Sequence, residues 1–454
     1  MTDTHFAILD EQKLNAFHWR TIAVTGLGVF CDGYDISSIA LVLTPALATY
    51  HVTGADDVAN VKGWLTAAAL IGSMVGSLIF GALAQRGRKR FYGLDAMILG
   101  LAALGQAFMP NWIALVACRF ILGIGVGADY VLSPTIMAEH ANRADRGKAI
   151  GLGFGTMWPI GALTAALFKL LLDSFHVPPE VVWKVVLAGG AVPALGVMYF
   201  RRAMPESPRF LARVAADQAK ASQVMQELAG ERAPPPSVDT RPFWEVFRQH
   251  AGHIFAGALL WMIYDLVVYA AILFGPDIIA QNLGIPSSIY QLETELIFVI
   301  PPSILMSWFL LDRWGRKPVQ VWGFAAGAAT LALFAWMRAT PGVSALAAYI
   351  VYGLFNVAQT GPGLVSGAGV LGVELAPTRI RSVAQSITVI GGRIGATIAA
   401  FAFPQLNHHL GFIAAISGLG ALSLLGAVLS QLLVPETSSR SLEDINLERA
   451  PAKA

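Results

Sequence analysis

Charged residues are scarce in this chain of 454 residues: only 13% are Asp, Glu, Lys or Arg, whereas 55% are hydrophobic. Soluble domains carry about 25% charged residues, so this composition excludes an ordinary soluble protein. Cysteine is almost absent too, and Cys31 and Cys118 both lie in apolar runs. They indicate neither a disulfide framework nor a redox centre. The composition predicts a polytopic membrane protein.

Other signals are also missing. The net charge of +2 is too small to indicate a nucleic-acid partner. The N-terminus lacks the basic region and short apolar core of a cleaved signal peptide, so we expect the first helix to direct insertion. The polar segments contain no nucleotide-binding loop, metal-spaced His or Cys cluster, or nucleophile motif. We therefore expect no enzymatic activity, no cofactor and no metal, and we give the adjacent His408 and His409 no metal role.

Twelve apolar runs are long enough to span a bilayer, which takes about 20 mainly apolar residues. They cover residues 20–49, 62–85, 91–109, 112–139, 148–173, 183–200, 253–280, 290–311, 318–337, 343–374, 382–409 and 411–433. The sequence thus predicts an all-α membrane protein with 12 transmembrane helices in two six-helix bundles. The predicted division is 1–200, a cytoplasmic linker 201–250 with amphipathic helices and a Pro-rich tether, 251–437, and a tail 438–454.

Lys and Arg are concentrated in alternate short loops. They follow the second, fourth, eighth and tenth runs, whereas the opposite loops, such as HVTGADD and QNLGIPSS, are nearly free of them. Because basic loops stay on the cytoplasmic side, we expect both termini and the linker to be cytoplasmic in a multi-pass protein of the cell membrane.

The two halves echo one another in sequence. GALAQRGRKR corresponds to LLDRWGRKP, AEHANRADRGK to VELAPTRIRS, and PESPRF to PETSSRSLED, each pair lying six spans apart and in the same order. Unrelated basic loops would explain the charges but not the shared motif order. The pattern indicates a duplicated six-helix unit with a site between the halves, which is typical of an alternating-access carrier.

These motifs resemble the major facilitator superfamily over essentially the whole chain. The run from Gly81 to Lys89 is similar to its signature loop and recurs at Asp312–Lys317, but Gln85 stands where the family has an Asp. The resemblance implies a cytoplasmic charge network that closes the inner gate, with the first-half lock weakened. The residues that we expect in this gate are Arg86, Arg88, Glu139, Arg146, Asp312, Arg316, Glu374 and Arg381.

Within the superfamily, GVGADYVLSPTIMAEHA and WMIYDLVVY resemble helices 4 and 7 of phosphate:proton symporters. CDGYD resembles their first helix but also that of aromatic-acid:proton symporters, and PESPRFL and PETSSRSLEDI are similar to sugar-porter motifs. The phosphate family's helix 5 Gln, helix 10 Asn and helix 11 Lys fall on Met157, Gly363 and Arg393. The resemblance implies proton-coupled symport of a small anion, phosphate or a carboxylate. Sugar or polyol symport and a non-transporting solute receptor are the alternatives.

Asp32 and Asp35 lie inside the first apolar run. A carboxylate near the bilayer centre costs about 2.5 to 3.5 kcal/mol, so such residues usually face a cavity or a cation. The two aspartates are one helical turn apart, and close carboxylates resist ionising together, so we expect one of them to hold a proton. The alternative is that one caps a broken helix and the other faces a loop.

Asp32, Asp265, Asn356 and Arg393 all lie about 11 to 13 residues into their helices, roughly 17 to 20 Å deep, which predicts one shared cavity. Arg393 is expected to hold the substrate anion and to meet Asp265 when the site is empty, or else to form a permanent pair with it. The other expected substrate-binding residues are Tyr34, Tyr130, Trp158, Trp261, Asp265, Tyr269, Asn356 and Gln359.

The expected proton-coupling residues are Asp32, Asp35, Arg119, Asp129 and Asp265. By resemblance to sugar symporters, Arg119 pairs with Asp32 or Asp35 as a switch, unless that bridge is fixed. Asp129 is either a proton relay or a partner of Arg146. Protonation of Asp32 or Asp35, with or without Asp265, would let an anion bind near Arg393 before the two halves change their relative orientation. The expected partners are a small-molecule substrate, protons and the lipid bilayer, and we expect a monomer.

Overall fold

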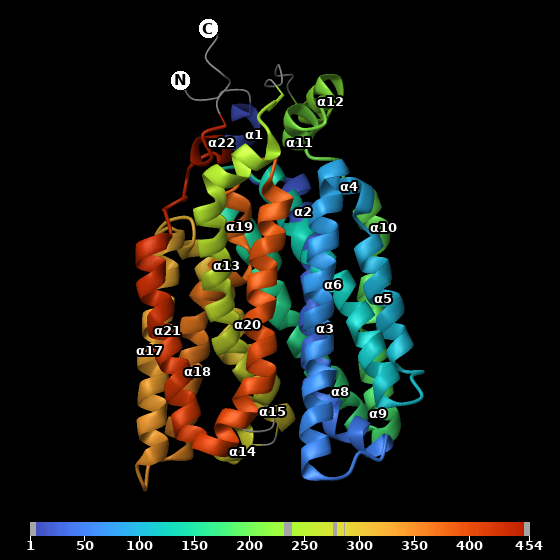
Figure 1. The fold of residues 1–454 in the computed structure, drawn as a ribbon, viewed down its shortest axis with the longest axis vertical. Helices are drawn as coiled ribbons and strands as arrows, with labels where there is room; N and C mark the ends of the chain where they lie inside the picture. The colour runs from blue at the N-terminus through green and yellow to red at the C-terminus, as the bar shows by residue number, and fades with distance from the viewer. Residues whose placement is uncertain (1–5, 231–237, 276–278, 286, 449–454) are drawn as a thin grey trace.

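The computed structural model describes residues 6–230, 238–275, 279–285 and 287–448, and these residues contain helices, turns and bends but no strand (Figure 1). Ten helices in these ranges are long and apolar enough to span a membrane. The two remaining predicted spans are the 13-residue α5 (Leu94–Gln106) and α18 (Ala345–Pro362). The prediction of an all-α protein with twelve spanning helices is confirmed.

The spanning helices gather in two groups that stand side by side (Figure 1). The first group contains α2 (Ala16–Thr49), α3 (Ala55–Leu83), α5, α6 (Trp112–His140), the continuous run α7 (Arg146–Ile150), η2 (Gly151–Thr156) and α8 (Met157–Ser174), and the pair α9 (Pro179–Gly189) and α10 (Ala191–Arg202). The second group contains four single helices, α13 (Phe243–Phe274), α17 (Arg316–Ala339), α20 (Arg381–Leu410) and α21 (Phe412–Leu433). Its two other spans are interrupted by π-helical turns. One consists of α15 (Ser287–Glu293), η4 (Thr294–Val299), α16 (Ile300–Leu305) and η5 (Met306–Leu310), and the other of α18, η6 (Gly363–Gly367) and α19 (Val370–Glu374). The two groups pack together along α3 with α20 and along α2 with α13.

Local sequence explains where several helices begin. The Asn15 side chain accepts hydrogen bonds from the first-turn amides of α2, and Asn111 does the same for α6. The largest departure from prediction is α13, which begins at Phe243 and not at 253. Its first turns carry charged residues, so an apolar run cannot reveal them, although the backbone is helical there.

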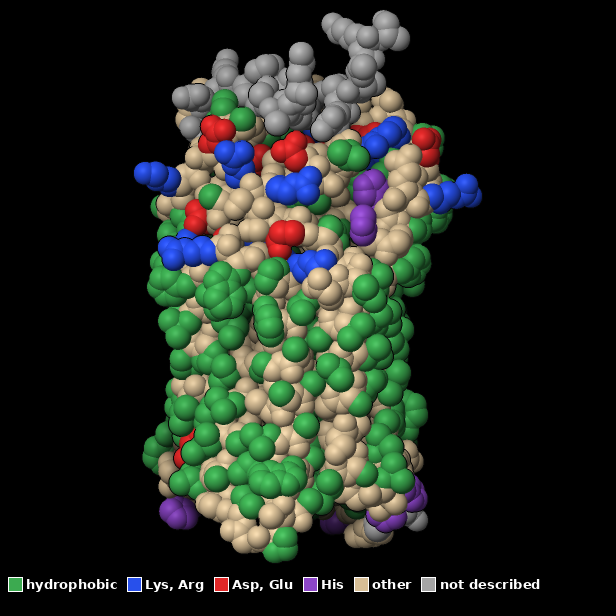
Figure 2. Space-filling model, turned by 90° about the vertical axis from the view of Figure 1, so that its left-hand side faces the viewer, with side chains coloured by type: hydrophobic (Ala, Val, Ile, Leu, Met, Phe, Trp, Pro, Cys, Tyr) green, Lys and Arg blue, Asp and Glu red, His purple; other side chains and the backbone are tan. Residues whose placement is uncertain are grey.

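Short helices and charged side chains cover one end of the molecule, which we call the basic face. It carries α1 (Ala7–Asp10), α4 (Arg88–Phe91), α11 (Pro208–Arg213), α12 (Gln218–Ala229) and α22 (Leu442–Ile445) (Figure 1). Figure 2 shows Lys, Arg, Asp and Glu gathered at this end above a belt of hydrophobic side chains. The segment predicted as a linker contains α11 and α12, and the Pro-rich tether at 231–237 lies outside the described residues.

The repeated motifs contact each other within each half. Gly87 and Gly315 of the two signature loops both have positive φ, 131° and 99°, a backbone conformation that favours glycine. Glu206 of PES accepts a hydrogen bond from the backbone amide of Lys89 at 3.1 Å. Its counterpart Glu436 of PET accepts one from the Arg316 amide at 3.0 Å. Each acid thus caps the helix that follows its signature loop, which gives the paired motifs a structural reason.

Candidate functional site: a central cavity and a charge network

A cavity of about 130 Å³ lies between the two halves. It is smaller than the 300–1,000 Å³ typical of drug-sized ligands, so it suits a small solute. Its polar and aromatic lining comes from both halves and includes Tyr130, Trp158, Trp261, Tyr264, Asp265, Tyr269, Tyr290, Gln291, Thr294, Glu295, Ser303, Asn356, Gln359, Thr360 and Arg393.

Arg393 on α20 is the cation of this cavity wall and is only 2% exposed. Its Nη2 lies 3.3 Å from Asp32 Oδ2 on α2, in the other half, and its Nη1 lies 4.0 Å from Asp265 Oδ2 on α13. It also donates hydrogen bonds to the Tyr269 hydroxyl and, at 3.3 Å, to Ser73 Oγ. The guanidinium therefore has a carboxylate on either side, one from each half.

The two carboxylates beside Arg393 differ in how well they are satisfied. Asp32 Oδ2 accepts hydrogen bonds from Tyr130 Oη at 2.8 Å and Trp158 Nε1 at 3.1 Å as well as from Arg393. Asp265 Oδ1 accepts one from Trp261 Nε1 at 3.1 Å, whereas Oδ2 is buried and has no hydrogen-bond partner among the described residues. Asp265 also lines the cavity. Its carboxylate therefore has fewer hydrogen-bond partners than that of Asp32.

Asp32 and Asp35 lie beside different arginines and not beside each other, and the expectation that one of them holds a proton stays a prediction. Asp35 accepts hydrogen bonds from Arg119 Nη2 at 3.1 Å and Nη1 at 3.3 Å. Arg119 also donates to Gln106 Oε1 at 2.9 Å and the Leu65 carbonyl at 2.6 Å. Of the two partners predicted for Arg119, the structure selects Asp35 and leaves Asp32 to Arg393.

Asp129 lies outside the cavity and does not pair with Arg146. Its Oδ1 is 2.6 Å from Arg201 Nη2 and accepts a hydrogen bond from Ser133 Oγ at 2.6 Å. Arg201 also pairs with Asp95. The apolar pattern singles out neither Arg201 nor Asp95, and Arg201 stands at the edge of a run, where it belongs to the predicted linker.

The remaining predicted substrate residues divide into two sets. Trp261, Tyr269, Asn356 and Gln359 line the cavity, together with Tyr130 and Trp158. Tyr34 does not line it, because its hydroxyl donates to the Val186 carbonyl at 2.7 Å within the first half. A substrate role for Tyr34 is therefore not supported in this conformation.

A network of buried ion pairs joins the halves at the basic face. Glu139 of α6 accepts hydrogen bonds from Arg88 and Arg381 at 2.9 Å each, and Arg88 also donates to the Thr378 carbonyl of the other half at 2.9 Å. Gln85, which replaces the usual Asp, donates to Ser382 Oγ across the same boundary at 2.7 Å. The first-half loop therefore still contacts the second half, through an amide and an arginine.

The second part of the network centres on Glu374. Its Oε1 lies 2.7 Å from Arg146 Nε of the first half and 2.9 Å from Arg316 Nη2 of the second. Asp312 pairs with Arg316 at 2.7 Å and accepts hydrogen bonds from the backbone amides of Gly147 and Lys148, at the start of α7. Arg86 differs from the other predicted gate residues: it is exposed and has no ion pair with a described residue.

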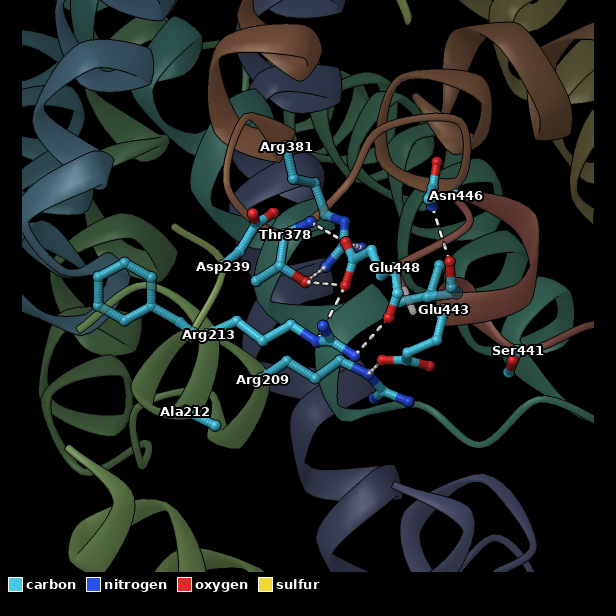
Figure 3. Close-up of polar contacts among 12 residues, drawn as sticks. Arg209, Ala212, Arg213, Asp239, Thr378, Arg381, Ser441, Glu443, Asn446 and Glu448 are labelled. Atoms are coloured by element: carbon cyan, nitrogen blue, oxygen red, sulfur yellow. Dashed lines mark hydrogen bonds and ion pairs between the residues drawn. The ribbon is translucent and has the colours of Figure 1, made fainter. Parts of the chain in front are cut away.

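Ion pairs attach the last described helix, α22, to this network (Figure 3). Arg209 of α11 pairs with Glu443 at 2.8 Å and with Asp10 of α1 at 2.7 Å, and Arg213 lies 3.1 Å from Glu448. Burial opposes ionisation of Glu443, but attraction to Arg209 outweighs it and lowers the pKa of Glu443 from 4.5 to about 2. The linker thus holds both ends of the described chain against the basic face.

Acid is expected to release α22. Because the pKa of Glu443 is lower in the folded state than its ordinary value of 4.5, its contribution to stability is complete above that pH and is lost as the pH falls toward 2. Glu443→Gln should loosen α22 at neutral pH by about 1.5 to 3 kcal/mol, roughly tenfold or more in amide exchange. Hydrogen exchange of residues 442–448 measures this. Exchange that is the same in the variant and the unmodified protein at pH 7 would contradict the assignment.

A cavity between two six-helix groups, with a charge network across one end, defines a membrane carrier of the major facilitator fold. A model of the sugar (and other) transporter family matches residues 21–448. The chain therefore belongs to the sugar (and other) transporter family.

Relatives and solved structures agree with this placement. The inorganic phosphate transporter 1-6 of Oryza sativa subsp. japonica is 31% identical, covering 96% of this chain and 94% of the relative. The probable inorganic phosphate transporter 1-6 of Arabidopsis thaliana is 29% identical over 98% and 96%. The proton:xylose symporter XylE bound to 6-bromo-6-deoxy-D-glucose superposes with a TM-score of 0.78 at 22% identity, covering 95% of this chain and 99% of its own. The inward-open xylose transporter XylE from E. coli gives 0.64 at 22%, with the same coverage.

Proposed function

We propose that this protein is a proton-coupled symporter of a small anion that works by alternating access, with inorganic phosphate as the first candidate. The observation that carries the proposal is Arg393 in the cavity wall, held between Asp32 of one half and Asp265 of the other. Arginine stays charged and binds phosphate or carboxylate through paired donors. The names of the phosphate transporter relatives support the choice of phosphate.

The charges explain why protons are needed. With Asp32 and Asp265 both ionised, the group around Arg393 carries one excess negative charge and repels an anion. Protonating Asp265 removes that excess, and the anion then competes with Asp32 for the guanidinium. Weakening the Arg393–Asp32 pair also removes an ion pair between the halves. Substrate binding would in this way loosen the contact that joins them at the level of the cavity.

The proposal assigns the basic face to the cytoplasm and the carrier to the cell membrane as a monomer, divided at 1–200, 201–250, 251–437 and 438–454. The network around Glu139 and Glu374 then acts as the inner gate, and this conformation has that gate closed. The Asp35–Arg119 pair and the Asp129–Arg201 pair lie away from the cavity. We propose that the Asp35–Arg119 pair is the proton-coupling switch and that Asp129 is a proton relay.

The test is uptake into proteoliposomes under an imposed pH gradient. Asp265→Asn is expected to lose gradient-driven phosphate accumulation, because an amide cannot carry the proton. Asp173→Asn is the control, since Asp173 forms only an exposed pair with Lys169. The proposal is wrong if Asp35→Asn and Asp265→Asn both accumulate phosphate as the unmodified protein does.

A sugar or polyol is the second candidate substrate. It is favoured by the amides of Gln291, Asn356 and Gln359 in the cavity lining, since sugar sites need such donors and acceptors. It leaves Arg393 without an anionic ligand. Phosphate and xylose offered in competition separate the two: an anion carrier takes up phosphate with no loss when xylose is in excess.

A further inference from the structure

Glu295 is the acidic residue of the cavity that the proposed cycle leaves without a role. It lies in η4, a π-helical turn inside the seventh candidate span of the described chain, and it is 4% exposed. Its side chain lines the same cavity as Asp265 and Arg393. Single π-helical turns interrupt α-helices frequently at functional sites, and here the turn begins immediately before the acid.

No described cation forms an ion pair with Glu295. Oε1 accepts a hydrogen bond from Gln291 Nε2 at 2.8 Å, and Oε2 is buried without a hydrogen-bond partner among the described residues. Arg393, the cation of the cavity wall, already has Asp32 and Asp265 beside it. A buried carboxylate with neither a cation nor a full set of donors is strongly disfavoured, so the neutral acid is the stable form.

The elements packed against η4 confirm this picture. They are α8, α15, α16 and α18. Their titratable groups are Tyr290 and Glu293 of α15 and Tyr349 and Tyr352 of α18, and Tyr264 of α13 also lines the cavity. α16 contains no titratable residue, and the charged residues of α8, Lys169 and Asp173, pair with each other at 2.6 Å. None of these groups neutralises a charged Glu295.

We infer that Glu295 is a second proton-binding site of the cavity, separate from Asp265, and that its proton crosses the membrane together with the substrate. The inference rests on the proposed symport function. It also supplies what that function needs: with protons on Asp265 and Glu295, a monovalent anion crosses with one net positive charge. Such a movement gains about 2.3 kcal/mol per 100 mV of membrane potential.

Transport of phosphate by Glu295→Gln tests the inference, since glutamine keeps the shape and the contact with Gln291 but cannot release a proton. Counterflow exchange needs no net proton movement, whereas accumulation under a pH gradient does. One pH unit drives about a tenfold accumulation per coupled proton, so we expect the ratio of accumulation to exchange to fall about tenfold in the variant. Accumulation should also become less sensitive to membrane potential. Glu293→Gln, two residues earlier and outside the cavity lining, is the matched control and should keep the unmodified ratio.

A second readout does not depend on the substrate. The infrared band of carboxyl groups that stay protonated at neutral pH, recorded on purified protein in nanodiscs, should lose one component in Glu295→Gln and none in Glu293→Gln. If the unmodified protein transports no phosphate but the component is lost, the proposed substrate fails and the proton site stands. The inference is overturned if the variant keeps both the carboxyl component and the accumulation ratio of the unmodified protein.

Discussion

Arg393→Ala is expected to abolish phosphate binding and uptake. Truncating one member of a buried, hydrogen-bonded charge pair typically costs 2 to 5 kcal/mol or more, and about 3 kcal/mol is about 100-fold in affinity. The loss is large here because Arg393 has carboxylates on both sides and is the cation that the cavity presents to an anion. Phosphate-induced thermal shift of the purified protein and uptake into proteoliposomes are the two measurements.

Arg393→Lys distinguishes geometry from charge. A lysine keeps the positive charge but not the planar fork that reaches Asp32, Tyr269 and Ser73 together, so we expect it to remain far below the unmodified protein. Arg313→Ala, an exposed residue of the basic face, is the control and should bind phosphate normally. Full phosphate binding by Arg393→Ala would remove the anion proposal and favour the sugar alternative.

Glu374→Gln is expected to open the basic face. Glu374 neutralises Arg146 of one half and Arg316 of the other, and all three side chains are 0% exposed. Breaking a buried pair by removing one partner costs about 3 to 5 kcal/mol, which shifts the balance of closed and open states by about 100-fold or more. The cost falls on the closed state alone, because an opened gate lets water reach the arginines.

Distances between spin labels at Lys89 and Arg313 report this opening. The two positions lie in the signature loops of opposite halves on the basic face, and Cys31 and Cys118 are buried, so introduced cysteines can be labelled selectively. The distance should lengthen in Glu374→Gln and stay unchanged in Asp173→Asn, which breaks an exposed pair. An unchanged distribution in Glu374→Gln would show that Glu374 does not hold the gate.

Much of the architecture follows from local sequence. A spanning helix satisfies its own backbone hydrogen bonds, so an apolar run of sufficient length indicates a helix wherever it occurs. The predicted spans 112–139 and 411–433 agree with α6 and α21 to within one residue at each end. It fails at the start of α13, where helical turns continue beyond the apolar run. It also overlooks Glu295, because two acids, Glu293 and Glu295, still leave the mean hydropathy of their run high.

The sequence by itself determined that the chain is a twelve-helix membrane protein with repeated motifs and which charges lie within its spans, because both depend only on composition and spacing along the chain. The tertiary structure decided the partners: Arg119 with Asp35, Arg393 with Asp32 and Asp265, and Arg201 with Asp129. Pairing depends on how each helix is rotated and which neighbour it packs against. Asp32 and Asp35 are one turn apart, yet that difference is enough to direct one to Arg393 and the other to Arg119.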